Sequence, residues 1–378
     1  MTRTTAAFPG ARRGYLALAD GRAFSGWVLG PVPALGEVVF NTAMFGYQEM
    51  LTDPSYRGQI LVLTTPHVGV VGTNPEDRES PRVWASGLVV QELEPVPSNW
   101  RSQKDLLQCT EENRTPLGFG FDTRAIVVHL RRYGALPGAL VATEDREEAV
   151  WLARQAKPTD GQDLTGDVSR KAPEVWREGP WKRALPVPAV RVGVLDFGVK
   201  ASILRQLVAA GAEVLVLPGN TGADDVAAFD LDGLVVSNGP GDPAAVGSAV
   251  RLLERLLGRL PILGVCLGHQ LLALALGGRT YKLKFGHHGA NHPVQVLGTG
   301  EVWITSQNHN YAVDAETLPK GAEVSMTNLT DGSVEGIVAS SLKAEGIQFH
   351  PEAGPGPHDA LRVFADFVAR CQIAKGDR

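Results

Sequence analysis

At 378 residues, 44% hydrophobic and 20% charged, the chain has the length of two domains and the composition of an ordinary globular protein. Its formal net charge is −5 and it contains no basic block, which argues against nucleic acid as the main ligand, because phosphate binding needs a concentrated positive surface. The sequence has no run of about 18 apolar residues that would predict a membrane span. Residues 1–13 lack the apolar stretch of a secretory signal.

The three cysteines are few and far apart. Cys109, Cys266 and Cys371 fit neither a disulfide framework nor a zinc cluster. Such a set suits a reducing compartment, so we expect the chain in the cytoplasm. A single cysteine in a special setting is then the feature to look for.

The first part of the chain, residues 1–156, indicates a strand-rich mixed domain. Asp20-Gly21 between two short apolar runs is typical of a β-hairpin, because this pair supplies the positive φ angles of a tight turn. Asp122 can cap a helix that Gly134 ends. The elements expected here are a hairpin over 15–24, strands over 36–41 and 87–93, and helices over 122–133 and 145–155.

Residues 157–188 contain many prolines and glycines and no sustained apolar period, which predicts a linker. After it, residues 189–378 alternate short apolar strands with helices, which is typical of parallel βαβ units in an α/β domain. In such sheets ligands bind at the carboxyl ends of the strands. The expected strands cover 191–197, 213–217, 231–237 and 261–265, and the expected helices cover 199–210, 223–229, 248–257 and 267–276.

Cys266 follows the last of these strands and directly precedes a helix. The run Gly264-Val265-Cys266-Leu267-Gly268 has the form of a nucleophile elbow, in which small flanking residues permit a strained turn from strand to helix. A thiol at a helix N-terminus favours the thiolate, and the N–H of Leu267 can stabilise an oxyanion. The alternative is an inert cysteine in a core strand, which the elbow spacing disfavours.

A cysteine nucleophile also needs a histidine that a carboxylate orients. His350 follows a strand-like segment, and Pro351 ends that segment so that His350 and Glu352 are presented at its carboxyl end. His-Pro-Glu alone is a weak signal. In combination with the elbow it predicts a catalytic triad of Cys266, His350 and Glu352.

These motifs resemble those of the class I (triad) glutamine amidotransferases. That family combines an elbow of the form Gly-x-Cys-x-Gly-His-Gln with a downstream His-Pro-Glu, and this chain has both, at 264–270 and 350–352. The loop over 237–243 resembles the one that supplies backbone N–H groups near the thiol in that family. By itself such a loop is only a turn signal.

Segments along most of the chain resemble the carbamoyl-phosphate synthetase small chain. Four of them lie in the N-terminal part, which other amidotransferases of this class lack. The segments are Phe40–Glu49, Leu51–Tyr56, Thr65–Gly69, Phe121–Arg124, Lys284–Gly289, Asn291–Pro293 and Gln307–His309. The resemblance implies a mostly parallel α/β amidotransferase domain over 189–378 and a smaller strand-rich mixed domain over 1–156 that docks to a partner.

The resemblance, carried over position by position, also implies the residues that contact glutamine. They are Ser55, Gly239, Gly241, Leu267, Gln270, Asn308, Asn310 and Tyr311. The family usually has Gly at the position of Asn310, Phe at that of Tyr311 and a smaller Thr at that of Phe45. If the family's Gly adopts a positive φ, Asn is its most tolerant replacement.

The activity that the resemblance implies is hydrolysis of L-glutamine to glutamate and ammonia. The ammonia would pass to a large synthetase subunit that makes carbamoyl phosphate for arginine and pyrimidine biosynthesis. No ATP motif is visible here, so we expect no cofactor in this chain, and ATP and Mg only on the large subunit. The complex would be a heterodimer or a higher oligomer.

Three other functions remain open from the residues. They are an amidotransferase subunit of another pathway, a catalytically silent activating subunit, and an esterase or peptidase that uses the same elbow. A metal is not expected, because His287, His288 and His292 lie on a turn without nearby Cys or Asp ligands, which is poor zinc geometry.

Overall fold

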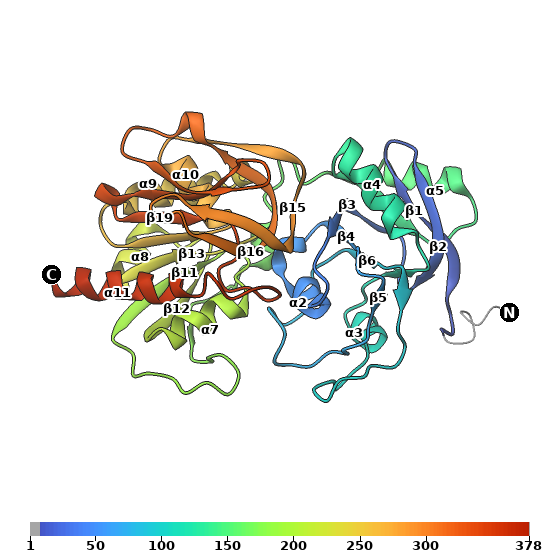
Figure 1. Ribbon diagram of the computed structural model, residues 1–378, viewed down its shortest axis with the longest axis horizontal. Helices are drawn as coiled ribbons and strands as arrows, with labels where there is room; N and C mark the ends of the chain where they lie inside the picture. The colour runs from blue at the N-terminus through green and yellow to red at the C-terminus, as the bar shows by residue number, and fades with distance from the viewer. Residues whose placement is uncertain (1–7, 378) are drawn as a thin grey trace. The chain divides into compact units, whose positions relative to one another are not determined.

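The computed structural model describes residues 8–377, which divide into two compact units (Figure 1). The first unit runs up to Asp160 and also includes Lys284–His288, and the second comprises Gly161–Leu283 and the residues from Gly289 onward. The sequence-based boundaries at 156 and 188 stay a prediction. Among the described residues, no helix combines the length and the apolar character needed to cross a membrane.

The first unit is built on a closed β-barrel, in the order β1-β2-β8-β6-β4-β3-β9. The predicted hairpin is confirmed: β1 pairs antiparallel with β2, and Gly21 in the turn between them has a φ of +96°. The barrel strands are β1 (Arg12–Leu18), β2 (Ala23–Leu29), β3 (Ala34–Asn41), β4 (Gln59–Leu63), β6 (Gly87–Val89), β8 (Leu117–Phe119) and β9 (Leu136–Val141). The short strands β5 (His67–Val68) and β7 (Glu92–Leu93) pair with each other.

The helix predicted over 122–133 begins and ends at its predicted capping residues, and the one predicted over 145–155 begins after Asp145 but ends at Ala153. Asp122 accepts a hydrogen bond from the N–H of Ala125 at the start of α4, and Gly134 ends that helix. Ile126 and Leu130 of α4 are buried in the barrel core, which supplies the main stabilisation of so short a helix. The helices of the unit are α2 (Tyr47–Thr52), η1 (Pro54–Tyr56), α3 (Leu106–Glu112), α4 (Thr123–Tyr133) and α5 (Arg146–Ala153).

The second unit contains a ten-stranded sheet in the order β10-β12-β11-β13-β14-β19-β18-β17-β15-β16. The central strands, from β12 to β19 in that order, are parallel, whereas β10 and β18 join them antiparallel. The strands are β10 (Glu174–Trp176), β11 (Val190–Asp196), β12 (Ala212–Pro218), β13 (Gly233–Val236), β14 (Ile262–Val265), β15 (Arg279–Val296), β16 (Val302–Asp314), β17 (Glu323–Asn328), β18 (Val334–Ala339) and β19 (Ala344–Ile347).

Helices cover both faces of this sheet, and the predicted α/β class is confirmed (Figure 1). Helices α7 and α11 pack over one face, and α8, α9 and α10 lie over the other. The central strands are buried on both faces, which explains why they read as continuous apolar runs. The helices are α6 (Thr165–Val168), α7 (Ala201–Ala209), α8 (Ala223–Ala228), η2 (Pro243–Ala245), α9 (Gly247–Leu256), α10 (Leu267–Ala275), η3 (Ala315–Thr317), η4 (Ser340–Leu342) and α11 (Arg362–Gly376).

The range 157–188, which was expected to be a linker, contains α6 and the edge strand β10. The three residues of β10 pair antiparallel with β12, and Trp176 packs on the core of the second unit. A strand this short has no periodicity that a sequence can display. It forms because the edge of a larger sheet offers it hydrogen bonds.

Candidate active site

The turn between β14 and α10 holds Cys266 in a strained conformation. Its φ is 54° and its ψ is −105°, outside the regions that most residues occupy, and a residue held there costs on the order of 1–3 kcal/mol. A Cβ on Gly264 would lie 2.5 Å from the carbonyl oxygen of Gly268, and one on Gly268 would lie 2.0 Å from that of Val236. The backbone therefore has the elbow geometry that the sequence motif predicts.

This crowding makes Gly268→Ala a severe change. Because the added methyl would overlap the backbone of β13, we expect the variant to unfold at least about 3 kcal/mol more easily, or to fail to accumulate in soluble form. Gly298→Ala is the matched control, since a Cβ there meets nothing within 4 Å. Urea unfolding of both variants provides the comparison. Equal stability of the two would contradict the packing described.

His350 and Glu352 lie together after the carboxyl end of β19. Nδ1 of His350 lies 2.7 Å from Oε1 of Glu352, and both side chains are buried. Because a carboxylate accepts, Nδ1 carries the proton of this bond and Nε2 is the nitrogen left for chemistry. The backbone N–H of His350 donates to the carbonyl of Ser306 at 2.9 Å, which ties the histidine to β16.

The thiol of Cys266 and the imidazole of His350 interact electrostatically. The nearby Cys266 raises the pKa of His350. In the unreacted chain, however, Sγ donates to the carbonyl oxygen of Asn308 at 3.6 Å, and Nε2 of His350 has no well-aligned hydrogen-bond partner within residues 8–377. Such contacts commonly tighten only when substrate is bound. In this geometry the carbonyl of Asn308 is the group that accepts from the thiol.

Lys200 is a member of this site that the sequence analysis did not single out. Its side chain is 3% exposed, and Nζ lies 2.9 Å from Oε1 of Glu352 and donates to the carbonyl of Ala353 at 2.6 Å. A buried ammonium so close to a buried carboxylate neutralises it and restricts its position. The residue precedes α7, 66 positions before Cys266, and no motif marks it.

The three charges determine how the site titrates. Burial lowers the pKa of His350 and is the largest single influence on it, but the Glu352 carboxylate and Cys266 together outweigh burial and raise this pKa to about 10. Burial would raise the pKa of Glu352, but Lys200 and His350 together lower it to about 2. At neutral pH the site therefore favours an imidazolium beside a carboxylate.

The raised pKa of His350 predicts a pH dependence of stability. The pKa of His350 is about 10 in the folded chain and has an ordinary value of 6.5. Protonated His350 therefore stabilises the folded state fully below pH 6.5, and this stabilisation disappears as the pH rises through about 10. The stability advantage of the wild type over His350→Gln should shrink across that window in urea titrations. The contribution of Glu352 is lost only below pH 4.5, as the pH falls through about 2. If the stability advantage of the wild type over His350→Gln instead grew from pH 6.5 to 10, folding would not raise the pKa of His350.

The loop after β13 carries two of the predicted glutamine contacts. Gly241 has a φ of +93°, and a Cβ on Gly239 would lie 2.2 Å from the carbonyl oxygen of Phe197, so both positions require glycine. Leu267 is the first residue of α10, where backbone N–H groups lack intrahelical acceptors. Gln270 lies one turn further along the same helix and is buried.

Asn308, Asn310 and Tyr311 lie in strand β16 and not in a loop, and all three are buried. Asn310 is not among the residues with positive φ, so its replacement of the family's usual glycine requires no left-handed backbone. Ser55 belongs to the first unit, where it lies in η1 with its N–H bonded to the Asp53 side chain. The part of each of these residues in binding glutamine stays a prediction.

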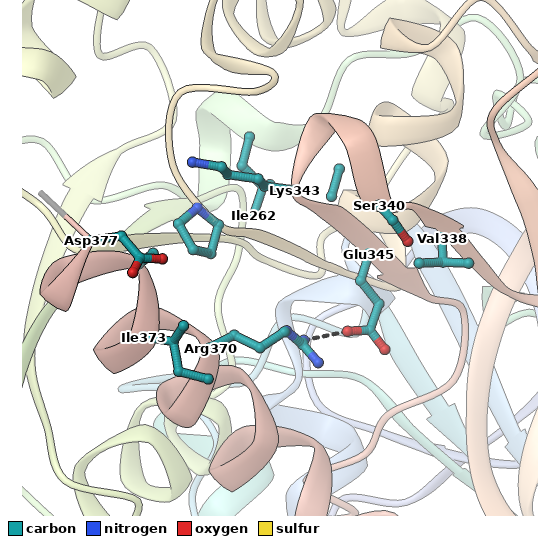
Figure 2. Close-up of a pocket in the computed structure, with 11 residues that line it drawn as sticks. Ile262, Val338, Ser340, Lys343, Glu345, Arg370, Ile373 and Asp377 are labelled. Atoms are coloured by element: carbon teal, nitrogen blue, oxygen red, sulfur yellow. Dashed lines mark hydrogen bonds and ion pairs between the residues drawn. The ribbon is translucent and has the colours of Figure 1, made fainter.

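A cavity of about 420 Å³ lies at the opposite end of the central strands from the cysteine. It is lined by the residues that begin β14 and β19, among them Ile262 and Ala344, and by the last turns of α11. Figure 2 shows Arg370 and Glu345 paired across it. Cys266 and His350 follow the carboxyl ends of β14 and β19, so this cavity is not the catalytic site.

Comparison with known proteins agrees with this geometry. Residues 193–370, which make up most of the second unit, match the family described as glutamine amidotransferase class-I. Residues 16–140 match the carbamoyl-phosphate synthase small chain, CPSase domain. The chain belongs to the carbamoyl phosphate synthase small chain family.

Curated relatives extend over nearly the whole chain. The carbamoyl phosphate synthase small chain of Syntrophotalea carbinolica is 49% identical over 93% of this chain and 96% of its own length. That of Aquifex aeolicus is 45% identical over 94% and 98%, and that of Pseudomonas aeruginosa is 46% identical over 94% and 97%. The resemblance drawn from the sequence is confirmed, and the chain is a glutamine amidotransferase subunit of carbamoyl phosphate synthase.

Proposed function

We propose that this chain hydrolyses L-glutamine to glutamate and ammonia with a triad of Cys266, His350 and Glu352. The observation that carries the proposal is the strained Cys266 at the start of α10, beside a buried imidazole whose Nδ1 is bonded to a carboxylate. Cysteine, histidine and carboxylate in this order of contact are the elements of nucleophilic acyl transfer.

The first step forms a bond between sulfur and the substrate. The proton of the Cys266 thiol moves to His350, whose raised pKa favours the resulting imidazolium, and the thiolate attacks the side-chain amide carbon of glutamine. Negative charge then develops on the amide oxygen. In this proposal the N–H of Leu267 and the backbone of the Gly239–Gly241 loop stabilise that oxyanion, which their position at the carboxyl edge of the central strands supports.

The second step releases ammonia and regenerates the thiol. The tetrahedral adduct breaks its C–N bond while protonated His350 gives its proton to the departing nitrogen. Water, deprotonated by the same imidazole, then attacks the γ-glutamyl thioester and releases glutamate. Glu352 and Lys200 touch no substrate atom in this scheme; they hold the imidazole and balance its charge.

The remaining parts of the reaction belong to a partner in this proposal. A large synthetase subunit would receive the ammonia and form carbamoyl phosphate from bicarbonate and ATP, for arginine and pyrimidine biosynthesis. ATP and Mg would bind only there, and this chain would act without a cofactor, in the cytoplasm. The relatives' name, small chain, supports a larger companion chain, and the three cysteines, all free thiols, suit a reducing compartment.

The test is co-purification of this chain with the large subunit, followed by an assay of glutamine-dependent carbamoyl phosphate formation. We expect the complex to use glutamine and ammonia, and the large subunit alone to use only ammonia. If the complex used ammonia but not glutamine, the chain would be a silent activating subunit. If no complex formed and glutamine was still hydrolysed, the partner would be wrong.

A further inference from the structure

One short segment of the second unit lies across the carboxyl ends of the central strands. This segment, Gly161–Arg170, is called the strap below. Arg170 donates to Oδ2 of Asp196, the last residue of β11, from its backbone N–H at 2.9 Å and from its guanidinium at 3.1 Å. The hydroxyl of Ser169 accepts from the N–H of Gly219, which follows β12, at 2.9 Å. These bonds fix the end of the strap to the ends of two neighbouring strands.

The start of the strap pairs with the loop after β13. An antiparallel bridge joins Asp163 to Gly241, and the N–H of Asp242 donates to the carbonyl oxygen of Gln162 at 3.0 Å. A Cβ on Gly241 would lie 2.5 Å from the same carbonyl oxygen. The strap is therefore in direct backbone contact with the Gly239–Gly241 loop, so the position of one restricts the position of the other.

The carboxylate of Asp242 ties this loop to two other segments. Its Oδ2 accepts from the N–H of Gly161 in the strap at 2.9 Å, and its Oδ1 accepts from the N–H of Ala244 at 2.9 Å. The second bond caps η2, which packs against α10, the helix that begins directly after Cys266. One side chain thus connects the strap, the loop and the segment that supports the nucleophile helix.

The loop needs such support because glycine restricts its own backbone very little. Gly239 and Gly241 have more accessible conformations than other residues, so contacts with their surroundings must select one. Gly239 is held at one end of the loop, where a Cβ would lie 2.2 Å from the carbonyl oxygen of Phe197. At the other end, the strap and Asp242 restrict the loop. A donor stabilises an oxyanion effectively only at about 2.7–3.1 Å from that oxygen, so even a small shift of the loop matters.

We propose that Asp242 is a positioning residue for glutamine hydrolysis: its bond to the strap holds the backbone N–H groups of the Gly239–Gly241 loop in place for the oxyanion. The inference rests on the proposed glutaminase function, in which that loop stabilises the oxyanion. Asp242 touches no reacting atom and acts only through the loop. Its side chain is partly exposed, so removing one of its bonds should leave the chain folded.

The variant that tests this role removes the bond to the strap and keeps the cap of η2. In Asp242→Ser one oxygen remains beside the backbone and can still cap η2 at Ala244, but no second oxygen reaches Gly161. Asp163→Ser is the matched control, because it makes the same substitution within the strap. There Oδ1 of Asp163 accepts from Thr165, which also belongs to the strap, and the backbone bridge to the loop stays in place.

Each protein, in complex with its large subunit, is assayed for glutamate release and for the rate at which iodoacetamide inactivates that activity. Alkylation by iodoacetamide requires the Cys266 thiolate but forms no oxyanion, so it reports the state of the triad alone. For Asp242→Ser we expect kcat to fall about tenfold or more, because a displaced oxyanion donor forfeits part of the roughly 10²–10³ in kcat that a whole donor contributes. KM should change less than about threefold. The inactivation rate and the thermal unfolding midpoint should stay close to those of the wild type, and Asp163→Ser should match the wild type in every one of these measurements.

Other outcomes would overturn the inference. If Asp242→Ser kept kcat within about twofold of the wild type, its bond to the strap would not position the loop. A fall of kcat together with the inactivation rate or the unfolding midpoint would mean that Asp242 supports the triad or the fold instead of the loop. An equal loss of kcat in Asp163→Ser would assign the effect to the strap in general. These results differ from a failure of the proposed function, in which the wild-type complex itself would release no glutamate from glutamine.

Discussion

Replacing Cys266 by Ser should lower glutamine hydrolysis by about 10³-fold or more while leaving the chain folded. A serine hydroxyl is a far weaker acid than a thiol, so His350 cannot generate an equivalent nucleophile from it. The side chains are nearly equal in size, so the elbow keeps its packing. Glutamate release is the assay, and the thermal unfolding midpoint reports the fold. The wild type should also accumulate a γ-glutamyl adduct, detectable by mass spectrometry after rapid acid quench, that the variant lacks.

Cys109→Ser is the matched control for this variant. Cys109 is also a buried free cysteine, but it belongs to α3 of the first unit, and burial raises the pKa of its thiol. The Cys109→Ser variant should therefore still hydrolyse glutamine, and a thiol-alkylating agent should still inactivate it. If Cys266→Ser kept turnover within about tenfold of the wild type, the thioester scheme would have to be abandoned.

Lys200→Met should destabilise the chain by about 3–5 kcal/mol, because it leaves the buried Glu352 carboxylate without its ammonium partner. The pKa of Glu352 should rise, since Lys200 contributes to holding it low. Without Lys200, Glu352 would hold the imidazole of His350 less firmly, so glutamine turnover should fall as well. Urea unfolding and the glutaminase assay together measure the two effects.

Two further variants separate this effect from the loss of any lysine. Lys375→Met removes a half-exposed ammonium from the buried Asp232 carboxylate, which keeps a hydrogen bond from the N–H of Arg191, so the loss should be roughly 0–1 kcal/mol. The double variant Lys200→Met with Glu352→Gln no longer contains an orphaned carboxylate, so it should recover part of the lost stability without recovering turnover. Equal stability of Lys200→Met and Lys375→Met would show that Lys200 does not hold the triad.

The features of this chain that its sequence predicts are the local ones. The turn at Gly21, the cap at Asp122 and the stop at Gly134 each depend on contacts within a few residues, so they are visible in the order of residue types. The elbow at Cys266 is local in the same way, because strand, strained turn and helix are consecutive. The His350–Glu352 contact also spans only two residues.

What the tertiary structure decided is the set of contacts between segments far apart in the chain. Lys200 reaches Glu352 only because β11 and β19 belong to one sheet, and no spacing in the sequence announces a buried ammonium. The Asn308 carbonyl that accepts the Cys266 thiol comes from β16, and the orientation of Gln270 depends on Tyr311 and Gln348. Residue types identify the nucleophile and its base, but their protonation and the alignment of substrate groups depend on desolvation and on hydrogen bonds that exist only after the sheet has assembled.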